Sequence, residues 1–362
     1  MFQDVYRGRR VLVTGHTGFK GSWLTRWLLD LGAEVTGVAL APDTSPSLFQ
    51  LLKLHDHIQH HELDVRDAEG LRLVVQEARP EIVFHLAAQA LVRLSYQEPK
   101  ATWDVNVGGT VNLLEALRQM GGVRACVVVT SDKCYENREQ VWGYRECDPM
   151  GGHDPYSSSK GATELAVASW RRSFFKGPAD THLATARAGN VIGGGDWSSD
   201  RIVVDLVRSI ASGRPLVLRN PDATRPWQHV LEPLSGYLTL AEHLFRENGQ
   251  ELAGGWNFGP AEGNTVTVGT LARALVEAWG AGEIQVNQDP RQPHEAGLLK
   301  LDCSQARSQL GWQGVWNFAE TVRQTVGWYH GFHLGADADR LTGEQVAAYQ
   351  SAATKAHLPW TV

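Results

Sequence analysis

Short apolar runs recur along the chain and alternate with longer segments whose apolar residues lie three or four positions apart. Such runs are typical of buried strands in a parallel sheet, and the longer spacing predicts helices. We expect strands at 10–14, 34–40, 82–86, 127–129, 183–187 and 255–259, and one that ends at Leu63. We expect helices at about 23–31, 68–78, 99–120, 157–175, 230–244 and 268–279. This alternation predicts an α/β fold with a doubly wound parallel sheet.

The sharpest boundary in the pattern lies where Val127-Val128-Val129 runs directly into Thr130-Ser131-Asp132-Lys133. Ligands of open α/β sheets bind just outside the carboxyl ends of the strands. Ser131 offers a hydroxyl there, Asp132 a carboxyl and Lys133 an amine. These three residues are therefore candidate catalytic groups, and a solvated strand end is the alternative interpretation.

The composition limits which classes of partner and which cellular compartment we expect for the protein. The chain has 362 residues and a net charge of −6, which argues against nucleic acid or an anionic membrane as the main partner. Its four cysteines form no C-x-x-C pair, and no run of ~18 apolar residues is present. We therefore expect a cytoplasmic protein with reduced thiols and no membrane span. We interpret the histidine-rich stretch 55–62 as a solvated surface and expect no metal site.

A glycine-rich turn follows the first expected strand, in the order Gly15-His16-Thr17-Gly18-Phe19-Lys20-Gly21, and a helix follows the turn. Gly15 permits a tight turn, Gly18 lets the backbone approach a pyrophosphate, and Gly21 lets the helix pack close to the strand. The positive end of the helix then faces the phosphates. The pattern predicts a Rossmann-type dinucleotide site, although glycines alone would also fit a structural turn.

The end of the second strand bears on the choice of cofactor. An acidic residue there would bind the adenosine ribose of NAD, and an arginine would favour NADP. The segment Ala39–Ser45 offers only Asp43 and hydroxyls, and no arginine or lysine occurs before Lys53. The absence of a cation favours NAD.

Tyr156 and Lys160 form a Y-x-x-x-K pattern at the start of an expected helix, so both side chains share one face. A phenol with a pKa near ~10 is a poor base at neutral pH. A nearby ammonium, with the positive nicotinamide, stabilises the phenolate, so we expect Lys160 and the cofactor together to lower the pKa of Tyr156. Tyr156 could then take a proton from a sugar hydroxyl while hydride leaves for NAD.

The G-x-x-G-x-x-G spacing, together with these groups, resembles the extended branch of the short-chain dehydrogenase/reductase superfamily, whose members modify nucleotide sugars. Over about residues 8–335 the chain resembles the CDP-D-glucose 4,6-dehydratases in particular. The motifs are the glycine turn, Thr130-Ser131-Asp132-Lys133-Cys134-Tyr135, Arg187-Ala188-Gly189-Asn190-Val191-Ile192-Gly193-Gly194-Gly195-Asp196-Trp197 and Arg225-Pro226-Trp227-Gln228-His229-Val230. Lys133 stands where the related dTDP-glucose enzymes have glutamate, a departure that resembles the CDP enzymes.

The resemblance implies a set of site residues. The implied catalytic groups are Ser131, Asp132, Lys133, Tyr156 and Lys160. The candidate cofactor contacts are Gly15, Thr17, Gly18, Phe19, Lys20, Gly21, Asp64, Val65, Leu86, Ala87, Gln89, Asn106, Thr130, Tyr156 and Lys160. The candidate substrate contacts are Asn190, Arg201, Arg225 and His294. A homodimer packed through the helices near 101–120 and 157–175 is also implied.

A dehydrogenase or an epimerase would need Tyr156, Lys160 and NAD but no further acid and base. An elimination would use both Asp132 and Lys133, because oxidation at C4 acidifies the C5 proton and water can then leave from C5 and C6. The resemblance implies that CDP-D-glucose becomes CDP-4-keto-6-deoxy-D-glucose, a precursor of bacterial surface deoxysugars. It places Lys133 as the C5 base, or as a group that only polarises the enolate, and Asp132 as the C6 acid. The alternatives are another nucleotide-sugar dehydratase, a 4-epimerase and a non-catalytic NAD sensor.

The domain expectation follows from the same pattern. Residues 1–188, with about 228–258 packing back, are expected to bind NAD. A smaller, interleaved C-terminal domain of about 189–227 and 259–340 is expected to bind the nucleotide sugar. We expect the polar residues 341–362 to form a peripheral tail.

Overall fold

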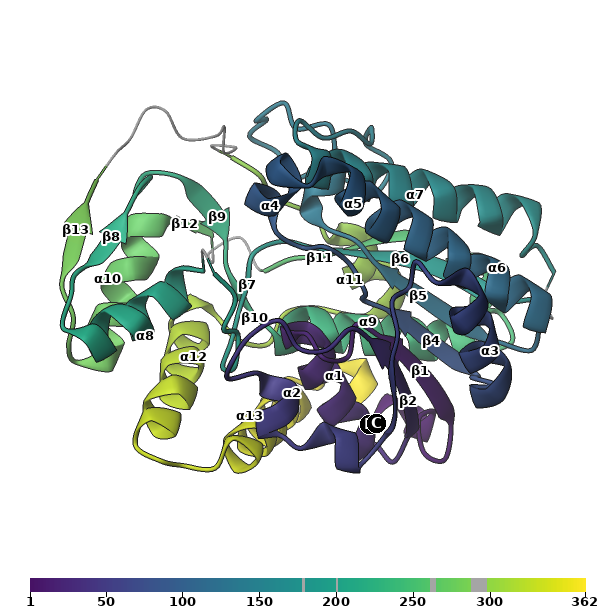
Figure 1. The fold of residues 1–362 in the computed structure, drawn as a ribbon, viewed down its shortest axis with the longest axis horizontal. Coiled ribbons are helices and arrows are strands. Elements are labelled where there is room, and N and C mark those ends of the chain that lie inside the picture. The colour runs from purple at the N-terminus through teal and green to yellow at the C-terminus, as the bar shows by residue number, and fades with distance from the viewer. Residues whose placement is uncertain (178–179, 200, 261–264, 288–297) are drawn as a thin grey trace.

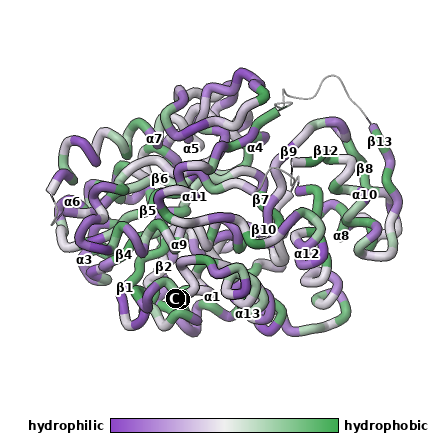
Figure 2. Tube along the Cα trace, turned by 180° about the vertical axis from the view of Figure 1, so that it is seen from behind, coloured by the Kyte–Doolittle hydropathy of each residue, from purple (hydrophilic) through white to green (hydrophobic). Residues whose placement is uncertain are grey.

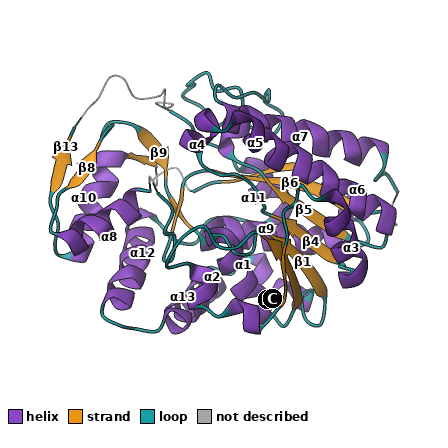
Figure 3. Ribbon diagram, in the orientation of Figure 1, coloured by secondary structure: helices purple, strands orange, loops and turns teal. Residues whose placement is uncertain are grey.

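A computed structural model describes residues 1–177, 180–199, 201–260, 265–287 and 298–362 (Figure 1). Its central sheet has seven parallel strands in the order β11-β6-β5-β4-β1-β2-β3. The strands are β1 (Arg10–Thr14), β2 (Glu34–Ala39), β3 (Gln59–Glu62), β4 (Ile82–His85), β5 (Ala125–Val129), β6 (His182–Ala188) and β11 (Gly255–Phe258). The predicted doubly wound, Rossmann-type α/β fold is confirmed (Figure 3).

Successive residues of a strand face opposite sides of the sheet, so each strand contributes to two cores. On β1, Val11 and Val13 belong to one cluster and Leu12 to the other. The first cluster includes side chains of α1 (Phe19–Asp30) and α9 (Leu231–Phe245). The second includes side chains of α3 (Ala68–Ala78), α6 (Thr110–Met120) and α7 (Pro155–Ser173). These helices alternate hydrophilic and hydrophobic positions, as one-sided packing requires (Figure 2).

The strand order reverses at β1, which pairs with β2 on one side and β4 on the other. The chain first builds β2 and β3 outward from β1, and then β4, β5 and β6 in the opposite direction. Helices that follow β1 and β4 therefore diverge to opposite faces. A crevice opens at the carboxyl ends of these strands, which is where such sheets bind ligands.

A smaller lobe stands beside these carboxyl ends, at the left of Figure 1. It contains α8 (Ile202–Ser212), α10 (Val268–Trp279) and the parallel pair β8 (Leu216–Leu218) and β13 (Ile284–Val286). An antiparallel pair, β9 (Thr224–Pro226) and β12 (Thr265–Thr267), and a parallel pair, β7 (Val191–Ile192) and β10 (Gln228–His229), connect it to the main body. Between β10 and β12 the chain returns to the large sheet as α9 and β11, so the two parts interleave.

The expected single helix 99–120 is interrupted. The structure has α5 (Pro99–Trp103), a π-helical turn (Asp104–Gly109) and then α6. Gly108 and Gly109 favour helix weakly, and the carbonyl of Asn106 accepts hydrogen bonds from the hydroxyls of Thr110 (2.7 Å) and Thr163 (2.9 Å). Periodicity alone does not reveal such a turn, because the apolar spacing continues through it. Among the described helices, none is long and apolar enough to cross a membrane.

The C-terminal residues 341–362 are not a peripheral tail, contrary to our expectation. They form most of α13 (Ala338–Lys355) and a short 3-10 turn, and they bury Tyr349 and Trp360 in the main core. The ring of Trp360 stacks on that of Phe2, with centroids 5.0 Å apart. The backbone N–H of Gln3 donates to the carbonyl of Val362 at 2.8 Å, so the two chain ends lie side by side.

Glu232, which is buried on α9, binds the C-terminal region through hydrogen bonds. Its carboxylate accepts hydrogen bonds from the backbone N–H groups of Val315 (2.9 Å) and Trp316 (2.7 Å) and from the Tyr349 hydroxyl (2.8 Å). Burial raises the pKa of Glu232 to about 7, although these hydrogen bonds oppose the rise. The native state therefore retains this proton at pH values where the unfolded chain has released it.

We expect this group to make stability depend on pH. Because the pKa of Glu232 is raised in the native state, its protonated carboxyl contributes fully to the free energy of unfolding below the pKa that Glu232 has in the unfolded chain. This contribution is lost as the pH rises to about 7. The loss is on the order of 3 kcal/mol relative to a residue that does not titrate. The measurement is the Tm of the wild type and of Glu232→Gln at pH 5 and pH 8. Between these two pH values, the Tm of the variant should rise relative to that of the wild type. A difference independent of pH would contradict this.

Candidate active site

A cavity of about 1090 Å³ opens at the carboxyl ends of β1, β4, β5 and β6, and residues of the smaller lobe complete its wall. All the predicted site residues line this cavity except two. Asn106 lies behind the wall, and His294 lies outside the described residues. The structure thus brings together groups that the sequence separates by as many as 210 positions, from Gly15 to Arg225.

The glycine turn is shaped for close approach. Gly15 has a φ of +75°, and a Cβ there would lie 2.7 Å from the backbone nitrogen of Ala87. A Cβ on Gly21 would lie 2.1 Å from the carbonyl oxygen of Gly15, so a side chain would separate α1 from the turn. Gly18 is the N-cap of α1, which directs the free N–H groups of the helix at the cavity. These residues fit the diphosphate of a dinucleotide.

The two ends of this cofactor region differ in charge. At one end, Asp64 accepts hydrogen bonds from the backbone N–H and the guanidinium of Arg66, and the side-chain bond to the guanidinium is the largest cause that lowers the pKa of Asp64. At the other end, burial lowers the pKa of the Lys20 ammonium to about 8; nearby Arg201 adds to this effect and Asp132 opposes it. Lys20 therefore lies within electrostatic reach of the candidate catalytic groups, beyond the cofactor turn itself.

The polar residues after β5 form a tight 3-10 turn, Asp132–Cys134, capped by Ser131. The Ser131 hydroxyl accepts from the Lys133 N–H (3.2 Å) and donates to Asp132 Oδ1 (3.0 Å). Lys133 Nζ also contacts Asp132 Oδ1, at 3.3 Å, and the lysine side chain is 32% exposed. Asp132 is buried, and its Oδ2 has no hydrogen-bond partner among the described residues. This oxygen lies beside Gly189, where a Cβ would approach it to 2.8 Å.

Tyr156 and Lys160 project from the first turns of α7. Asp154 caps this helix by accepting from the Ser157 N–H at 3.0 Å, and Pro155 begins it. Burial raises the pKa of Tyr156 to about 12, although a hydrogen bond with Ser131 opposes the rise. In the protein alone, burial therefore outweighs any lowering of the Tyr156 pKa, and the predicted effect of Lys160 together with a nicotinamide stays a prediction. The Lys160 ammonium instead donates to the Val129 carbonyl at 3.3 Å, and burial lowers its own pKa to about 8.

Asn106 supports the site indirectly. Its amide donates to Ser159 Oγ (2.9 Å), and its Oδ1 accepts from the backbone N–H of Gln89 (2.9 Å). It therefore joins the helix of Tyr156 to the segment after β4. We predicted that Asn106 contacts the cofactor directly, and its buried position behind the cavity wall does not by itself provide such a contact.

The candidate substrate residues lie toward the smaller lobe. Asn190 Oδ1 is buried without a partner among the described residues. Arg201 is 45% exposed and faces Asp196 at 3.8 Å, and Arg225 donates to the Thr224 carbonyl at 2.9 Å. Two cations and an amide on one wall can hold a diphosphate.

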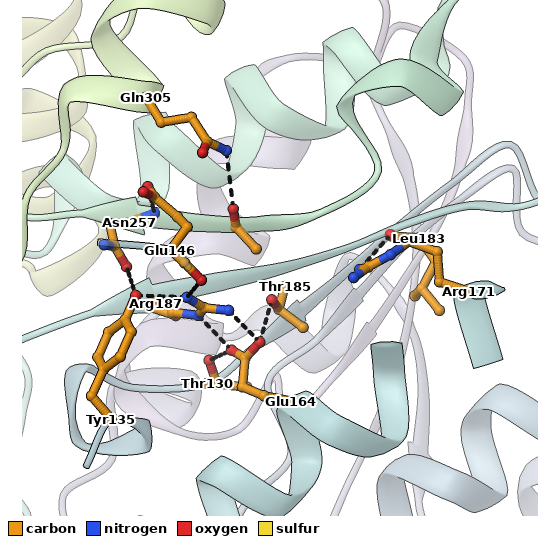
Figure 4. A network of polar contacts seen from close by, with 11 residues as sticks. Thr130, Tyr135, Glu146, Glu164, Arg171, Leu183, Thr185, Arg187, Asn257 and Gln305 are labelled. Atoms are coloured by element: carbon orange, nitrogen blue, oxygen red, sulfur yellow. Dashed lines mark hydrogen bonds and ion pairs between the residues drawn. The ribbon is translucent and has the colours of Figure 1, made fainter. Parts of the chain in front are cut away.

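Sequence reasoning missed the groups beneath the site, which Figure 4 shows. Glu164 on α7 and Arg187 on β6 form a buried ion pair that also contacts Thr130 and Tyr135. One signal was available: Glu164 lies four residues after Lys160, so it shares the inward face of the helix. Arg187 was recognised as the end of a strand and the start of a family motif, but no role was predicted for its side chain.

A protein family described as GDP-mannose 4,6 dehydratase matches residues 12–325. The chain belongs to this family. The CDP-glucose 4,6-dehydratase of Salmonella typhimurium is 49% identical over 358 residues, covering 98% of this chain and 99% of that protein. The predicted resemblance to nucleotide-sugar dehydratases is confirmed.

Other similar proteins are more distant. The UDP-glucose 4-epimerase of Mycolicibacterium smegmatis is 28% identical, over 88% of this chain and 97% of that protein. The crystal structure of the Thermus thermophilus UDP-glucose 4-epimerase with NAD has a TM-score of 0.76 and 28% identity, covering 89% of this chain and 99% of that one. The dTDP-glucose 4,6-dehydratase of Streptomyces venezuelae, solved with NAD, has a TM-score of 0.75 at 23% identity and shares the fold; it covers 91% of this chain and 99% of that one.

We expect Gly189→Ala to impair catalysis by displacing the Asp132 carboxylate. A Cβ 2.8 Å from Oδ2 must push that oxygen aside, and small misplacements of a catalytic group cost on the order of ten- to a hundredfold in kcat. The measurement is kcat and KM for the nucleotide-sugar substrate, with a thermal melt of each protein. Gly327→Ala on α12 (Phe318–His333) is the matched control, because a Cβ there meets nothing within 4 Å. Equal kcat values for the two variants would contradict the placement.

Proposed function

We propose that the chain is an NAD-dependent CDP-D-glucose 4,6-dehydratase that forms CDP-4-keto-6-deoxy-D-glucose. The observation that carries the proposal is the Asp132–Lys133 pair beside Ser131 and Tyr156 in one cavity. An oxidation alone would not require this acid and base, whereas an elimination would use both of them. The 49% identity with a CDP-glucose 4,6-dehydratase supports the nucleobase and the sugar.

NAD, when bound, accepts hydride from C4 of the sugar and later returns it to C6. The glycine turn, Asp64, Val65, Leu86, Ala87 and Gln89 line the cavity and would hold it, and Thr130, Tyr156 and Lys160 are proposed as the contacts of its reactive end. The open, backbone-lined cradle at Gly15 and Gly21 supports this fit. The cofactor is regenerated, so the net reaction is loss of one water molecule.

The chain's own residues handle the protons. Tyr156 takes the proton of the C4 hydroxyl, and Ser131 holds the same oxygen. Because burial raises the pKa of Tyr156, deprotonation needs a nearby positive charge, which Lys160 supplies together with the oxidised cofactor. Asp132 Oδ2, the carboxylate oxygen without a partner among the described residues, protonates the departing C6 hydroxyl.

Lys133 is the proposed C5 base. The amine lies 3.3 Å from the Asp132 carboxylate, which supports roles for the two groups at the neighbouring carbons C5 and C6. A proton removed from C5 and a proton given to the C6 oxygen balance the elimination of water. Asn190, Arg201 and Arg225 are the proposed diphosphate contacts, and we retain His294 as a proposed nucleotide contact. The four cysteines of the described chain are free, which supports a cytoplasmic site of action.

The decisive experiment is incubation with CDP-, dTDP-, UDP- and GDP-hexoses in deuterated water, followed by NMR. We expect a 4-keto-6-deoxy product from CDP-glucose with deuterium at C5. A product epimerised at C4, with C6 still hydroxylated, would support the 4-epimerase instead. No product from CDP-glucose would overturn the proposal.

Lys133→Met tests the base. If Lys133 removes the C5 proton, the variant should oxidise C4 in a single turnover yet lose solvent exchange at C5 by a factor of ~100 or more. Absorbance of the reduced cofactor reports the oxidation, and NMR reports the exchange. Exchange at the wild-type rate would leave Lys133 only the role of polarising the enolate.

We further propose a homodimer packed through the helices near residues 101–120 and 157–175, which include parts of α5 and α7 and the whole of α6. Trp103 on α5 is 41% exposed and Leu165 on α7 is 62% exposed, although both are large and apolar. The two helices pack against each other, so these side chains extend one surface.

Leu165→Asp should convert the dimer to monomer, because a carboxylate would be desolvated at the interface. Sedimentation velocity measures the change. Leu73→Asp is the matched control, since Leu73 is 52% exposed on α3, outside the proposed interface. An unchanged assembly for both variants would exclude this interface.

A further inference from the structure

A bidentate ion pair lies buried directly beneath the active site. Glu164 projects from α7 and Arg187 from the end of β6, and both side chains are 5% exposed. The guanidinium donates from Nε to Glu164 Oε1 at 2.9 Å and from Nη2 to Oε2 at 2.8 Å (Figure 4). This fork geometry fixes the carboxylate plane as a single lysine partner could not.

The Glu164 carboxylate uses its remaining capacity on two hydroxyls. Thr130 Oγ1 donates to Oε1 at 2.5 Å, and Thr185 Oγ1 donates to Oε2 at 2.7 Å. Thr130 immediately precedes Ser131, and Glu164 lies four residues after Lys160 on the same helix. One carboxylate therefore joins the helix that carries Tyr156 and Lys160 to the start of the catalytic turn.

Arg187 holds the other end of that turn. Its Nη1 donates to the Tyr135 hydroxyl at 2.6 Å, and its guanidinium carbon lies 5.1 Å from the centroid of the Tyr135 ring. The Tyr135 hydroxyl in turn donates to Asn257 Oδ1 on β11 at 2.8 Å. The segment from Thr130 to Tyr135 is thus held at both ends by one ion pair.

Two glycines leave room for this arrangement. A Cβ on Gly255 of β11 would lie 2.2 Å from Arg187 Nη2, so the guanidinium fits only against a bare backbone. A Cβ on Gly161, the residue after Lys160, would lie 3.1 Å from the Cys134 carbonyl and 2.6 Å from that of Gly151. The catalytic helix and the catalytic turn are therefore in direct backbone contact, with no side chain between them to absorb a shift.

We propose that Glu164 and Arg187 are positioning residues for the reaction: they register the Ser131–Lys133 turn against the Tyr156–Lys160 helix and place a fixed negative charge beside the Lys160 ammonium. This inference rests on the proposed function. Neither residue lines the cavity, so both act through the groups that they hold.

The electrostatics agree with this geometry. Burial lowers the pKa of Lys160 to about 8, and Glu164 is the largest opposing influence. Burial alone would raise the pKa of Glu164, yet Arg187 and the hydroxyl contacts hold it below its usual range, so the carboxylate is charged. The titratable groups that face Lys160 are Glu164 on its own helix, Cys134 on the turn, His85 on β4 and Lys20 on α1. Of these, only Glu164 carries a negative charge at neutral pH.

A purely stabilising role is a poor explanation of the pair. Two buried charges lose their hydration, and well-packed apolar residues of similar volume often give equal or greater stability. What an apolar pair would not supply is the directional hold on Thr130 and Tyr135 or the charge beside Lys160. A test must therefore measure the relative placement of the turn and the helix, and the effect of the charge beside Lys160, separately from the stability of the fold.

Three variants make that separation. Glu164→Gln with Arg187→Met removes both charges without leaving one unpaired, Glu164→Asp keeps the charge but shortens its reach, and Glu232→Gln removes a buried carboxylate from the C-terminal region as a matched control. For the neutral pair we expect kcat with CDP-glucose to fall about tenfold or more, while KM changes less than about threefold. We expect the upper-pH limb of kcat to move down by about half a pH unit or more, because the pKa of Lys160 drops without Glu164.

The other two variants should divide the effects. Glu164→Asp should lower kcat while leaving the upper-pH limb in place, and Glu232→Gln should leave both unchanged even if its Tm falls. If the neutral pair folds and keeps the wild-type kcat and pH limb, the inference is wrong. If the neutral pair does not fold, Glu164→Asp alone tests the inference. An unchanged kcat for this variant would overturn it, and so would a lowered kcat together with a displaced upper-pH limb.

A second readout does not depend on the sugar. The pH dependence of NAD affinity, followed by tryptophan fluorescence, reports the same Lys160 ionisation, and its limb should move down in the neutral pair by the same amount. A wild type that binds NAD but converts no CDP-glucose would refute the proposed function alone. A wild type that converts CDP-glucose, with neither limb moved in the neutral pair, would refute only the positioning role.

Discussion

All seven strands of the central sheet run in one direction, and this constraint decides where chemistry can occur. The central strands β1, β4 and β5 are largely apolar where both faces are covered, polar or glycine residues follow β1 and β5 where the chain leaves the sheet, and in a parallel sheet every such exit falls on the same edge. The glycine turn, the Ser131–Lys133 turn and the Gly189–Asn190 segment therefore meet without any direct sequence relation. The smaller lobe needs only to stand over that edge to enclose a cavity.

Features that depend on neighbouring residues were predictable from the sequence. The glycine turn needs a strand before it and a helix after it, and Tyr156 and Lys160 need one helical turn; each is a local pattern with a physical reason. Features that depend on long-range packing were not. The burial of Trp360 rests on Phe2 at the other end of the chain, and the Glu164–Arg187 pair joins a helix to a strand with no periodic signal between them. The π-helical turn was hidden because the apolar spacing continues through it.

The pKa of Tyr156 illustrates a different limit. Sequence reasoning placed a phenol beside an ammonium and concluded that the phenol becomes more acidic. The structure adds desolvation, which acts on both groups: it raises the pKa of Tyr156 to about 12 and lowers that of Lys160 to about 8, so two groups with similar ordinary pKa values move apart. Residue identity and spacing carry the sign of a pairwise interaction. They do not carry the depth of burial, which here is the larger effect.

The meeting of the chain ends has a consequence for cooperativity. Phe2 and Trp360 share one aromatic stack, and the chain visits the large sheet, the smaller lobe, the sheet again and finally α13 before it closes on itself. No cut in the sequence separates the two lobes, because each is completed by segments that lie beyond the other. Fraying from either end opens the same cluster, and the two lobes that border the cavity should therefore melt as one unit rather than in sequence.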